Sequence, residues 1–220
     1  MTEELEQQPR RRGRPPKHAP AAPADDVFAA VLHAFAAHGY DGVSVRTLNQ
    51  ELGVSHNLLH ARFGSKAAMW RAAVDWGFGN LVAALDTADD ASLSPLARLR
   101  RFIVAFVMHS AEHPDLLRIV DIEAGRESDR LRYLIDTFIE PVQARMMPLF
   151  AHFATDAHAP RLPVHTAYFL ITSGGGAPFT SRALTRTLFG DSALTSTAIQ
   201  QHAEAIADVL TAGLSPSTDS

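Results

Sequence analysis

The sequence predicts an all-α fold, with a three-helix helix-turn-helix domain at the N-terminus followed by a larger helical domain. Apolar residues recur three and four positions apart, as in Val27, Val31 and Phe35, and no useful stretch alternates as a strand would. Serine, glycine and proline stand where helices would start and stop. Of the 220 residues, 46% are hydrophobic, which suffices for a helical core.

Four regions are expected along the chain. Residues 1–24 are rich in proline and nearly free of large apolar side chains, so they predict a flexible basic arm. Residues 25–70 are expected to form the helix-turn-helix domain and residues 71–214 the larger helical domain. Residues 215–220 are expected to be a disordered tail. The formal net charge is −4, but the arm is positive, so a polyanion would be bound at the N-terminal end.

Local signals place the individual helices. Asp25 and Asp26 suit the start of the first helix and Gly39 its end, while Ser44, Ser55 and Ser65 can cap the next three. The helices after the third are expected over residues 66–87, 95–113, 114–124, 129–153, 164–173, 178–189 and 195–213.

The second and third helices are joined by Gly53-Val54-Ser55, which predicts a helix-turn-helix. Glycine permits the tight turn, because it adopts positive φ readily. The third helix has the size to enter a major groove, where its N-terminal residues would meet base edges.

The segment from Ala29 to Met69 resembles the TetR family of bacterial regulators. The matching residues are Phe35, Gly39-Tyr40, Ser44-Val45-Arg46, Leu48, Gly53-Val54-Ser55, Leu59, Phe63 and Ser65-Lys66. The resemblance implies a regulator that binds double-stranded DNA, with an effector-binding and dimerisation region in the later helices. The chain departs from the family at Asn49, where a small residue is usual, and at Leu58 and His60, where threonine and tyrosine are usual.

The arm contains Arg12-Gly13-Arg14-Pro15, which resembles an AT-hook core. Arginines on a narrow backbone fit the A·T minor groove, although a basic tail that aids solubility is the alternative. In the third helix, Asn57 can pair with adenine through two hydrogen bonds. The candidate DNA contacts are Arg12, Arg14, Ser44, Arg46, Ser55, His56, Asn57, His60, Arg62 and Lys66.

The later helices offer a candidate effector pocket and a candidate dimer interface. Aromatic and polar residues beside a helix that Pro141 should kink suit a ligand cavity, with ordinary core as the alternative. Candidate pocket residues are Trp76, Phe102, Phe106, His109 and Phe138. Candidate interface residues, which could instead pack within one chain, are Phe169, Ile199, Ile206, Val209 and Leu210.

Two glycine features have two interpretations each. Gly77 and Gly79, inside the predicted 66–87 helix, mark either a hinge that transmits an effector signal or a close packing contact. The run Gly174-Gly175-Gly176 lacks the spacing of a phosphate loop, so it either separates two helices or lets helices approach closely.

Other classes of site have weak support. Cysteine is absent, and His109 and His113 would need a third ligand, such as His152, His158 or His165, to hold a metal. No arrangement of residues indicates a catalytic site, so we expect that the protein is not an enzyme and that it holds no metal and no cofactor. No signal peptide or membrane span is evident, so we expect a cytoplasmic protein.

The sequence therefore predicts a homodimeric regulator, a repressor that a small-molecule effector releases from a palindromic operator. Two alternatives stay open at this point. One is an A·T-preferring DNA-binding protein without an effector, and the other is a small helical metalloenzyme that uses the histidines.

Overall fold

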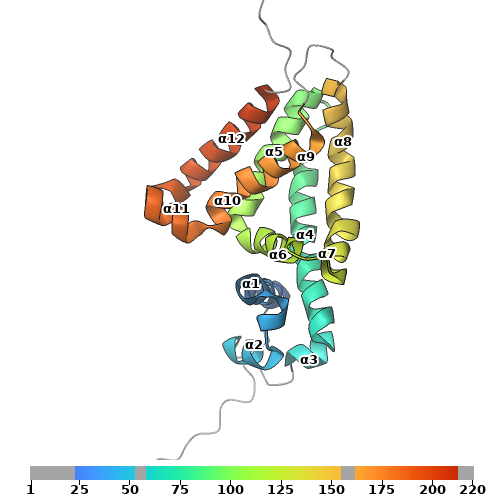
Figure 1. Ribbon diagram of the computed structural model, residues 1–220, viewed down its shortest axis with the longest axis vertical. Helices are drawn as coiled ribbons and strands as arrows, with labels where there is room; N and C mark the ends of the chain where they lie inside the picture. The colour runs from blue at the N-terminus through green and yellow to red at the C-terminus, as the bar shows by residue number, and fades with distance from the viewer. Residues whose placement is uncertain (1–22, 53–57, 155–161, 213–220) are drawn as a thin grey trace, which may run out of the picture.

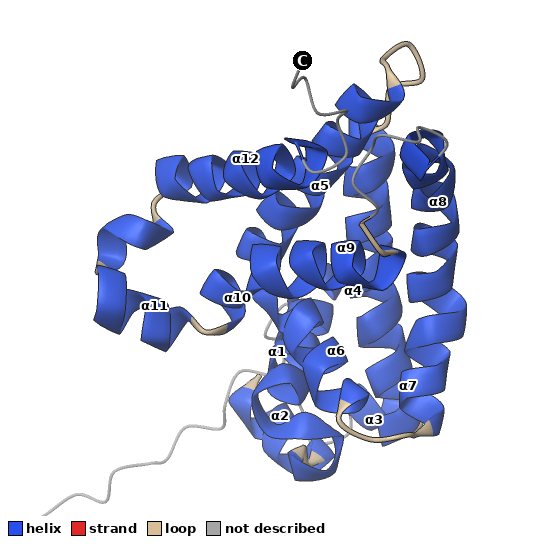
Figure 2. Ribbon diagram, turned by 45° about the horizontal axis from the view of Figure 1, so that its top comes forward, coloured by secondary structure: helices blue, strands red, loops and turns tan. Residues whose placement is uncertain are grey.

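The computed structural model describes residues 23–52, 58–154 and 162–212, and every regular element in these ranges is helical. The predicted all-α class is therefore confirmed (Figures 1 and 2). The elements are α1 (Ala24–Gly42), α2 (Val45–Glu51), α3 (Leu58–Phe63), α4 (Lys66–Ala88), α5 (Pro95–Glu112), α6 (Pro114–Ala124), α7 (Asp129–Leu134), η1 (Ile135–Ile139), α8 (Glu140–Ala154), α9 (Val164–Phe169), η2 (Leu170–Gly174), α10 (Gly175–Thr180), α11 (Arg182–Phe189), η3 (Asp191–Leu194) and α12 (Ser196–Ala212).

The local signals at the N-terminal helices act as predicted where the structure describes them. Gly39 interrupts α1 with φ of 68°, a conformation that glycine adopts without strain. The Ser44 hydroxyl accepts from the Thr47 N–H at 3.5 Å, and the Ser65 hydroxyl accepts from the Ala68 N–H at 3.1 Å. These caps fix where α2 and α4 begin, whereas the predicted Ser55 cap lies outside the described residues.

Helix α4 is the axis of the molecule. It begins beside α3 at one end and runs upward past α1 and α6, which lie on the same side of it, to reach α5 and α8 at the other (Figure 1). Its inner face carries the buried Trp70, Ala73 and Val74, each at most 1% exposed. One helix therefore belongs both to the small N-terminal domain and to the larger helical domain.

The two glycines of α4 differ in their surroundings. A Cβ at Gly77 would lie 3.2 Å from side-chain atoms of Leu32 and Leu116, so α1 and α6 approach α4 closely there. A Cβ at Gly79 would meet nothing within 4 Å. The close-packing interpretation therefore holds at Gly77, and the hinge stays a prediction.

A π-helical turn precedes each of two prolines in the larger domain. Element η1 ends two residues before Pro141, and the Glu140 N–H bonds to the Ile135 carbonyl five residues back. Element η2 ends four residues before Pro178. Proline removes a helical N–H, and a π turn is one way in which a helix accommodates the lost bond. The structure therefore shows a π turn before Pro141, and the kink predicted at Pro141 stays a prediction.

One predicted helix boundary is wrong. The 178–189 helix is two elements, because Ser181 leaves helical geometry with φ of −106° and ψ of 41°. The chain is helical from Val164 through the glycine run to Thr180. A Cβ at Gly175 would lie 2.6 Å from Cγ2 of Val107, and one at Gly176 would overlap Leu117. The run therefore does not separate helices; it lets α10 lie against α5 and α6.

We predict that Gly175→Ala destabilises the protein by about 1–3 kcal/mol, because the added methyl group overlaps Val107 in a packed core. Chemical denaturation measures the change. Gly174→Ala is the matched control, since its Cβ would lie 3.8 Å from Ile206, an ordinary contact. Equal stability of the two variants would contradict the close approach of α10 and α5.

Candidate DNA-binding surface and ligand cavity

Asn49 ties α2 to α3. Its side chain is buried at 1% exposure, donates to the Val45 carbonyl at 2.9 Å and accepts from the Leu59 N–H at 3.4 Å. An N–H in the first turn of a helix has no partner within that helix. Asn49 supplies one from a neighbouring helix and so fixes how α3 is held. The sequence marked Asn49 only as unusual, because its bonding partner lies ten residues away.

The candidate DNA contacts that the structure describes lie on and around α2 and α3, and their side chains differ in how many contacts hold them. Ser44, Arg46 and His60 are exposed, and no described side chain pairs with Arg46. Arg62 is exposed, and its guanidinium lies 5.1 Å from the centre of the Phe28 ring. Lys66 is the most constrained of the described candidates. Its Nζ lies 4.7 Å from the Tyr40 ring centre and donates to the Asp41 carbonyl at 3.5 Å.

The other candidate DNA contacts lie outside the described residues. They are Arg12 and Arg14 in the arm, and Ser55, His56 and Asn57 at the start of the predicted recognition helix. Their assignment therefore stays a prediction from the sequence.

A cavity of about 690 Å³ lies inside the larger helical domain. Its walls come from α4, α5, α6, the α7–α8 stretch and the α9–α10 stretch, and most of the side chains are apolar. The predicted pocket residues Phe102, Phe106 and Phe138 line it. A hollow of this size and character suits a small-molecule ligand.

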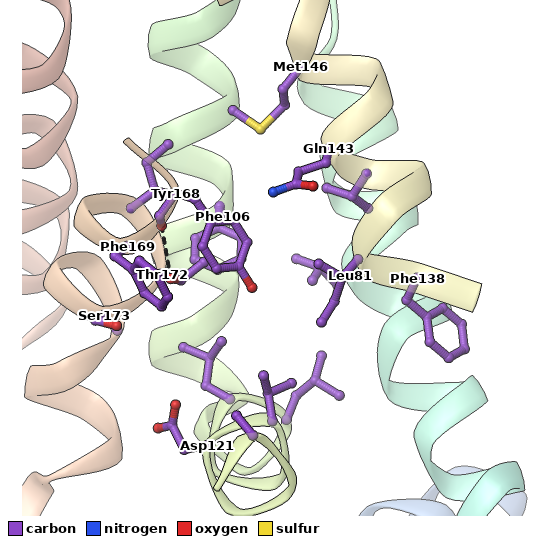
Figure 3. A pocket seen from close by; sticks show the side chains of 18 of the residues that line it. Leu81, Phe106, Asp121, Phe138, Gln143, Met146, Tyr168, Phe169, Thr172 and Ser173 are labelled. Carbon is purple, nitrogen blue, oxygen red and sulfur yellow. Dashed lines mark hydrogen bonds between the residues drawn. The ribbon is translucent and has the colours of Figure 1, made fainter. Parts of the chain in front are cut away.

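Polar groups occupy restricted parts of this cavity. In Figure 3, Asp121 lies at one end, Gln143 and Met146 lie toward the other, and Tyr168 stands between them. Partial loss of water raises the pKa of Asp121. Burial raises the pKa of Tyr168, and the negative charge of Asp121 raises it further. No described Lys, Arg or His side chain lines the cavity.

Two predicted pocket residues lie elsewhere. Trp76 turns toward α1, where its Nε1 donates to Asp25 at 3.1 Å and its ring stacks on Phe28. His109 is buried within the packing of α5 and does not line the cavity. Both assignments are wrong because helical periodicity places a residue on a face without saying which neighbour covers that face.

Aromatic side chains connect the cavity wall to the first helix. Phe78 stacks on Phe138 with 4.3 Å between ring centres, and Phe138 meets Tyr133 edge-on at 5.9 Å. Tyr133 lies 6.2 Å from Trp70, which lies 6.5 Å from Tyr40 at the end of α1. This series, here called the aromatic series, joins residues from α4, α7, η1 and α1.

The predicted interface residues divide into two groups. Leu210 is 2% exposed and belongs to the core where α12 packs on α5, so its assignment to an interface is wrong. Ile199 and Ile206 are half-buried against the same core. Val209 is 70% exposed, and Phe169, also at the cavity edge, is 60% exposed.

Helix α11 presents an exposed apolar face that the sequence analysis missed. Leu184, Leu188 and Phe189 are each more than half exposed. The four-residue spacing of the two leucines was the available signal. Val209 on α12 is a further exposed apolar side chain. Helices α11 and α12 lie on one side of the molecule (Figures 1 and 2).

Comparison with known sequences gives the N-terminal domain a family. Residues 28–73 match the model for bacterial regulatory proteins of the tetR family. The nucleoid occlusion factor SlmA of Vibrio vulnificus is 25% identical over 124 residues, 56% of this chain. That match spans 63% of the SlmA sequence.

Solved structures extend the likeness to the whole fold. The TetR-family regulator PfmR of Thermus thermophilus superposes with a TM-score of 0.66 at 20% identity, covering 90% of this chain and 100% of PfmR. FadR of Bacillus subtilis, solved with stearoyl-CoA, gives 0.63 at 13% identity, covering 86% of this chain and 98% of FadR. The N-terminal domain therefore matches the tetR family, and the chain as a whole has the fold of these solved regulators.

Two negative findings apply to the described part of this chain. No helix there is long and apolar enough to cross a membrane. No three His, Cys, Asp or Glu side chains gather there in a way that could hold a metal ion. Of the possible third ligands for His109 and His113, the side chains of His152 and His158 lie outside the described set.

His109 is an uncompensated polar group in the core of the larger domain. Its Nε2 is buried without a hydrogen-bond partner among the described residues, and its ring centre lies 4.6 Å from that of His113. Burial, followed by the nearby His113, lowers the pKa of His109 from 6.5 to about 4.

We therefore predict an acid-sensitive fold. Because the folded-state pKa of His109 lies below the unfolded value, the unfolded chain binds the proton more readily. The free energy of unfolding should fall by up to about 3 kcal/mol between pH 6.5 and pH 4 on account of this group. His109→Leu should flatten that slope in chemical denaturation at several pH values.

The exposed His165 supplies the control, because His165→Leu removes a histidine without touching the core. If His109→Leu keeps the wild-type slope, protonation of His109 is not what destabilises the acidic protein.

Proposed function

We propose that this protein is a homodimeric transcriptional regulator, a repressor that leaves its DNA operator when a small molecule enters the cavity of the larger domain. One observation carries the proposal. The 690 Å³ cavity is walled in part by Phe78 and Leu81 of α4, the helix that begins at the helix-turn-helix. A ligand that favours one arrangement of that wall therefore also favours one placement of α2 and α3.

The aromatic series supplies a contiguous path for this coupling. Phe138 lines the cavity, and Tyr40 lies two residues before the end of α1 at Gly42 and five residues before the start of α2 at Val45. Packed aromatic rings have few alternative arrangements, so a shift at one end displaces the next ring. A regulator needs such a path, whereas an A·T-binding protein without an effector would not.

The DNA-binding part of the proposal follows from the family match and the exposed polar groups around α2. Docking would place α3 in the major groove, with Arg46 against the phosphates and Asn57 at a base edge. The arm residues Arg12 and Arg14 would enter the adjacent minor groove. In this proposal the protein binds DNA without catalysing a reaction. Its polar groups position the protein on the phosphates and discriminate between base sequences.

We predict that removing a phosphate contact and removing a base contact change DNA binding in different ways. Arg46→Ala should weaken binding to operator and unrelated DNA alike and reduce the slope of log affinity against log salt by up to ~0.9. Asn57→Ala should cost about 1–3 kcal/mol at the operator and relax preference at one base step. In vitro selection would supply the operator, and fluorescence anisotropy at several salt concentrations would give the affinities.

Arg101→Ala is the control, because Arg101 lies in the second turn of α5 and pairs with Asp90 on the surface. Helix α5 begins at the end of the molecule away from α2 and α3 (Figure 1). Selection of sequences rich in A·T but without an inverted repeat would instead favour an A·T-binding protein. An unchanged operator preference in Asn57→Ala would remove that residue from base recognition.

Dimerisation is proposed through α11 and α12. Leu184, Leu188 and Phe189 on α11 and Val209 on α12 are apolar side chains on the exposed surface of these two helices, which no described part of the chain covers. A two-fold axis through that surface would join two helices from each protomer and place two recognition helices on one face of DNA.

We predict that Val209→Glu yields a folded monomer, because its side chain is 70% exposed in the protomer and the charge would be buried only in the dimer. Analytical ultracentrifugation at micromolar concentration measures the state. Ala83→Glu, on an exposed position of α4, adds the same charge elsewhere. Dimers that persist in Val209→Glu would exclude this face as the interface.

A further inference from the structure

The ionisable side chains that line the cavity indicate which charge its ligand would carry. Asp121 and Glu140 are the ionisable side chains other than Tyr168 among the described lining residues, and both are acidic. Arg118, the cation beside Thr180 at the edge of the cavity, is already engaged. It donates to the Thr180 carbonyl at 2.7 and 3.0 Å and pairs with Asp115 at 3.7 Å. An anionic ligand would therefore meet two like charges and no free cation in the described wall.

Asp121 itself has an unfilled bonding capacity. It is exposed and lines the hollow, and no described side chain or backbone N–H bonds to its carboxylate. A ligand that fills the cavity displaces the water around this group. A neutral apolar ligand would leave the carboxylate desolvated and unpaired, whereas a cation would pair with it.

The neighbouring walls suit the rest of such a ligand. Phe102, Phe106 and Tyr168 present aromatic rings in the same cavity, and aromatic faces attract cations. Beyond them the cavity continues toward Gln143 and Met146, where apolar side chains dominate (Figure 3). The polar end and the apolar body of a ligand would therefore lie at different ends of the hollow.

We propose that the cavity binds a hydrophobic cation, with its charged nitrogen at the Asp121 carboxylate and its apolar body extending toward Met146. The proposal rests on the proposed function only in taking this cavity as the effector site. The proposed ligand differs in charge from stearoyl-CoA, the anionic amphiphile with which FadR of Bacillus subtilis was solved. Fold likeness at 13% identity carries no ligand across.

Three probes with one chain length test the charge. They are decyltrimethylammonium, decanol and decanoate, titrated below their aggregation concentrations into full-length protein by isothermal titration calorimetry. The ammonium is expected to bind at least about tenfold more tightly than decanoate. Asp121→Asn should reduce ammonium affinity by about tenfold and leave decanol within about twofold. Asp121→Lys should invert the preference toward decanoate.

Asp136→Asn is the matched control, because Asp136 is exposed on η1 and does not line the cavity. It should leave all three affinities unchanged. Tighter binding of decanoate, an ammonium affinity indifferent to Asp121, or no ammonium binding at millimolar concentration would each overturn the inference. Thermal unfolding of every variant confirms that the cavity is intact.

A separate anisotropy measurement on selected operator DNA distinguishes the two proposals. If the ammonium binds through Asp121 but does not release DNA, the ligand class stands and the effector role fails. If DNA release follows decanoate rather than the ammonium, the effector role stands and the ligand class fails.

Discussion

The placement of the helix-turn-helix depends on one buried ion pair and the ring beside it. Glu123 of α6 is 1% exposed, and its carboxylate accepts from Arg130 at 2.8 Å and from the Ser128 hydroxyl at 3.3 Å. The Arg130 guanidinium also lies 4.1 Å from the centre of the Tyr40 ring. A buried carboxylate without its partner costs several kcal/mol, so Arg130 is held firmly. Because Tyr40 lies in the last turn of α1, the ion pair sets how the N-terminal domain meets α6 and α7.

Tyr40 then gathers contacts from both domains. It stacks on Phe35 of α1 at 5.8 Å and meets Trp70 of α4 at 6.5 Å, while Lys66 lies over its ring. The Gly39 conformation turns the ring into this position. A displacement of α7 or of the cavity wall thus reaches the last turn of α1 through packed groups.

Local patterns in the sequence were enough to predict the helices. They did not predict the surroundings of a side chain where residues distant in the sequence determine them. Ser44 and Ser65 act as caps because capping needs only the next three residues. Trp76 and Leu210 were placed wrongly, since one covers Phe28 of α1 and the other fills the core beneath α12. The contacts that make glycine necessary at Gly175 come from Val107, 68 positions earlier. Periodicity finds the apolar face of a helix, but only the fold says whether core, cavity or partner covers it.

The charge distribution constrains how a bound cation could act on DNA. Residues 71–220 carry a net charge of −5, so a cation in the cavity makes this domain less acidic and, if anything, favours a polyanion. Screening over a Debye length of about 8 Å removes most of that effect at the helix-turn-helix. Electrostatic repulsion therefore cannot release the operator. The proposed release would then come from a change in packing, and the aromatic series from Phe138 to Tyr40 connects the cavity wall to the first helix. The coupling equals the difference in ligand affinity between the two packing states of that series.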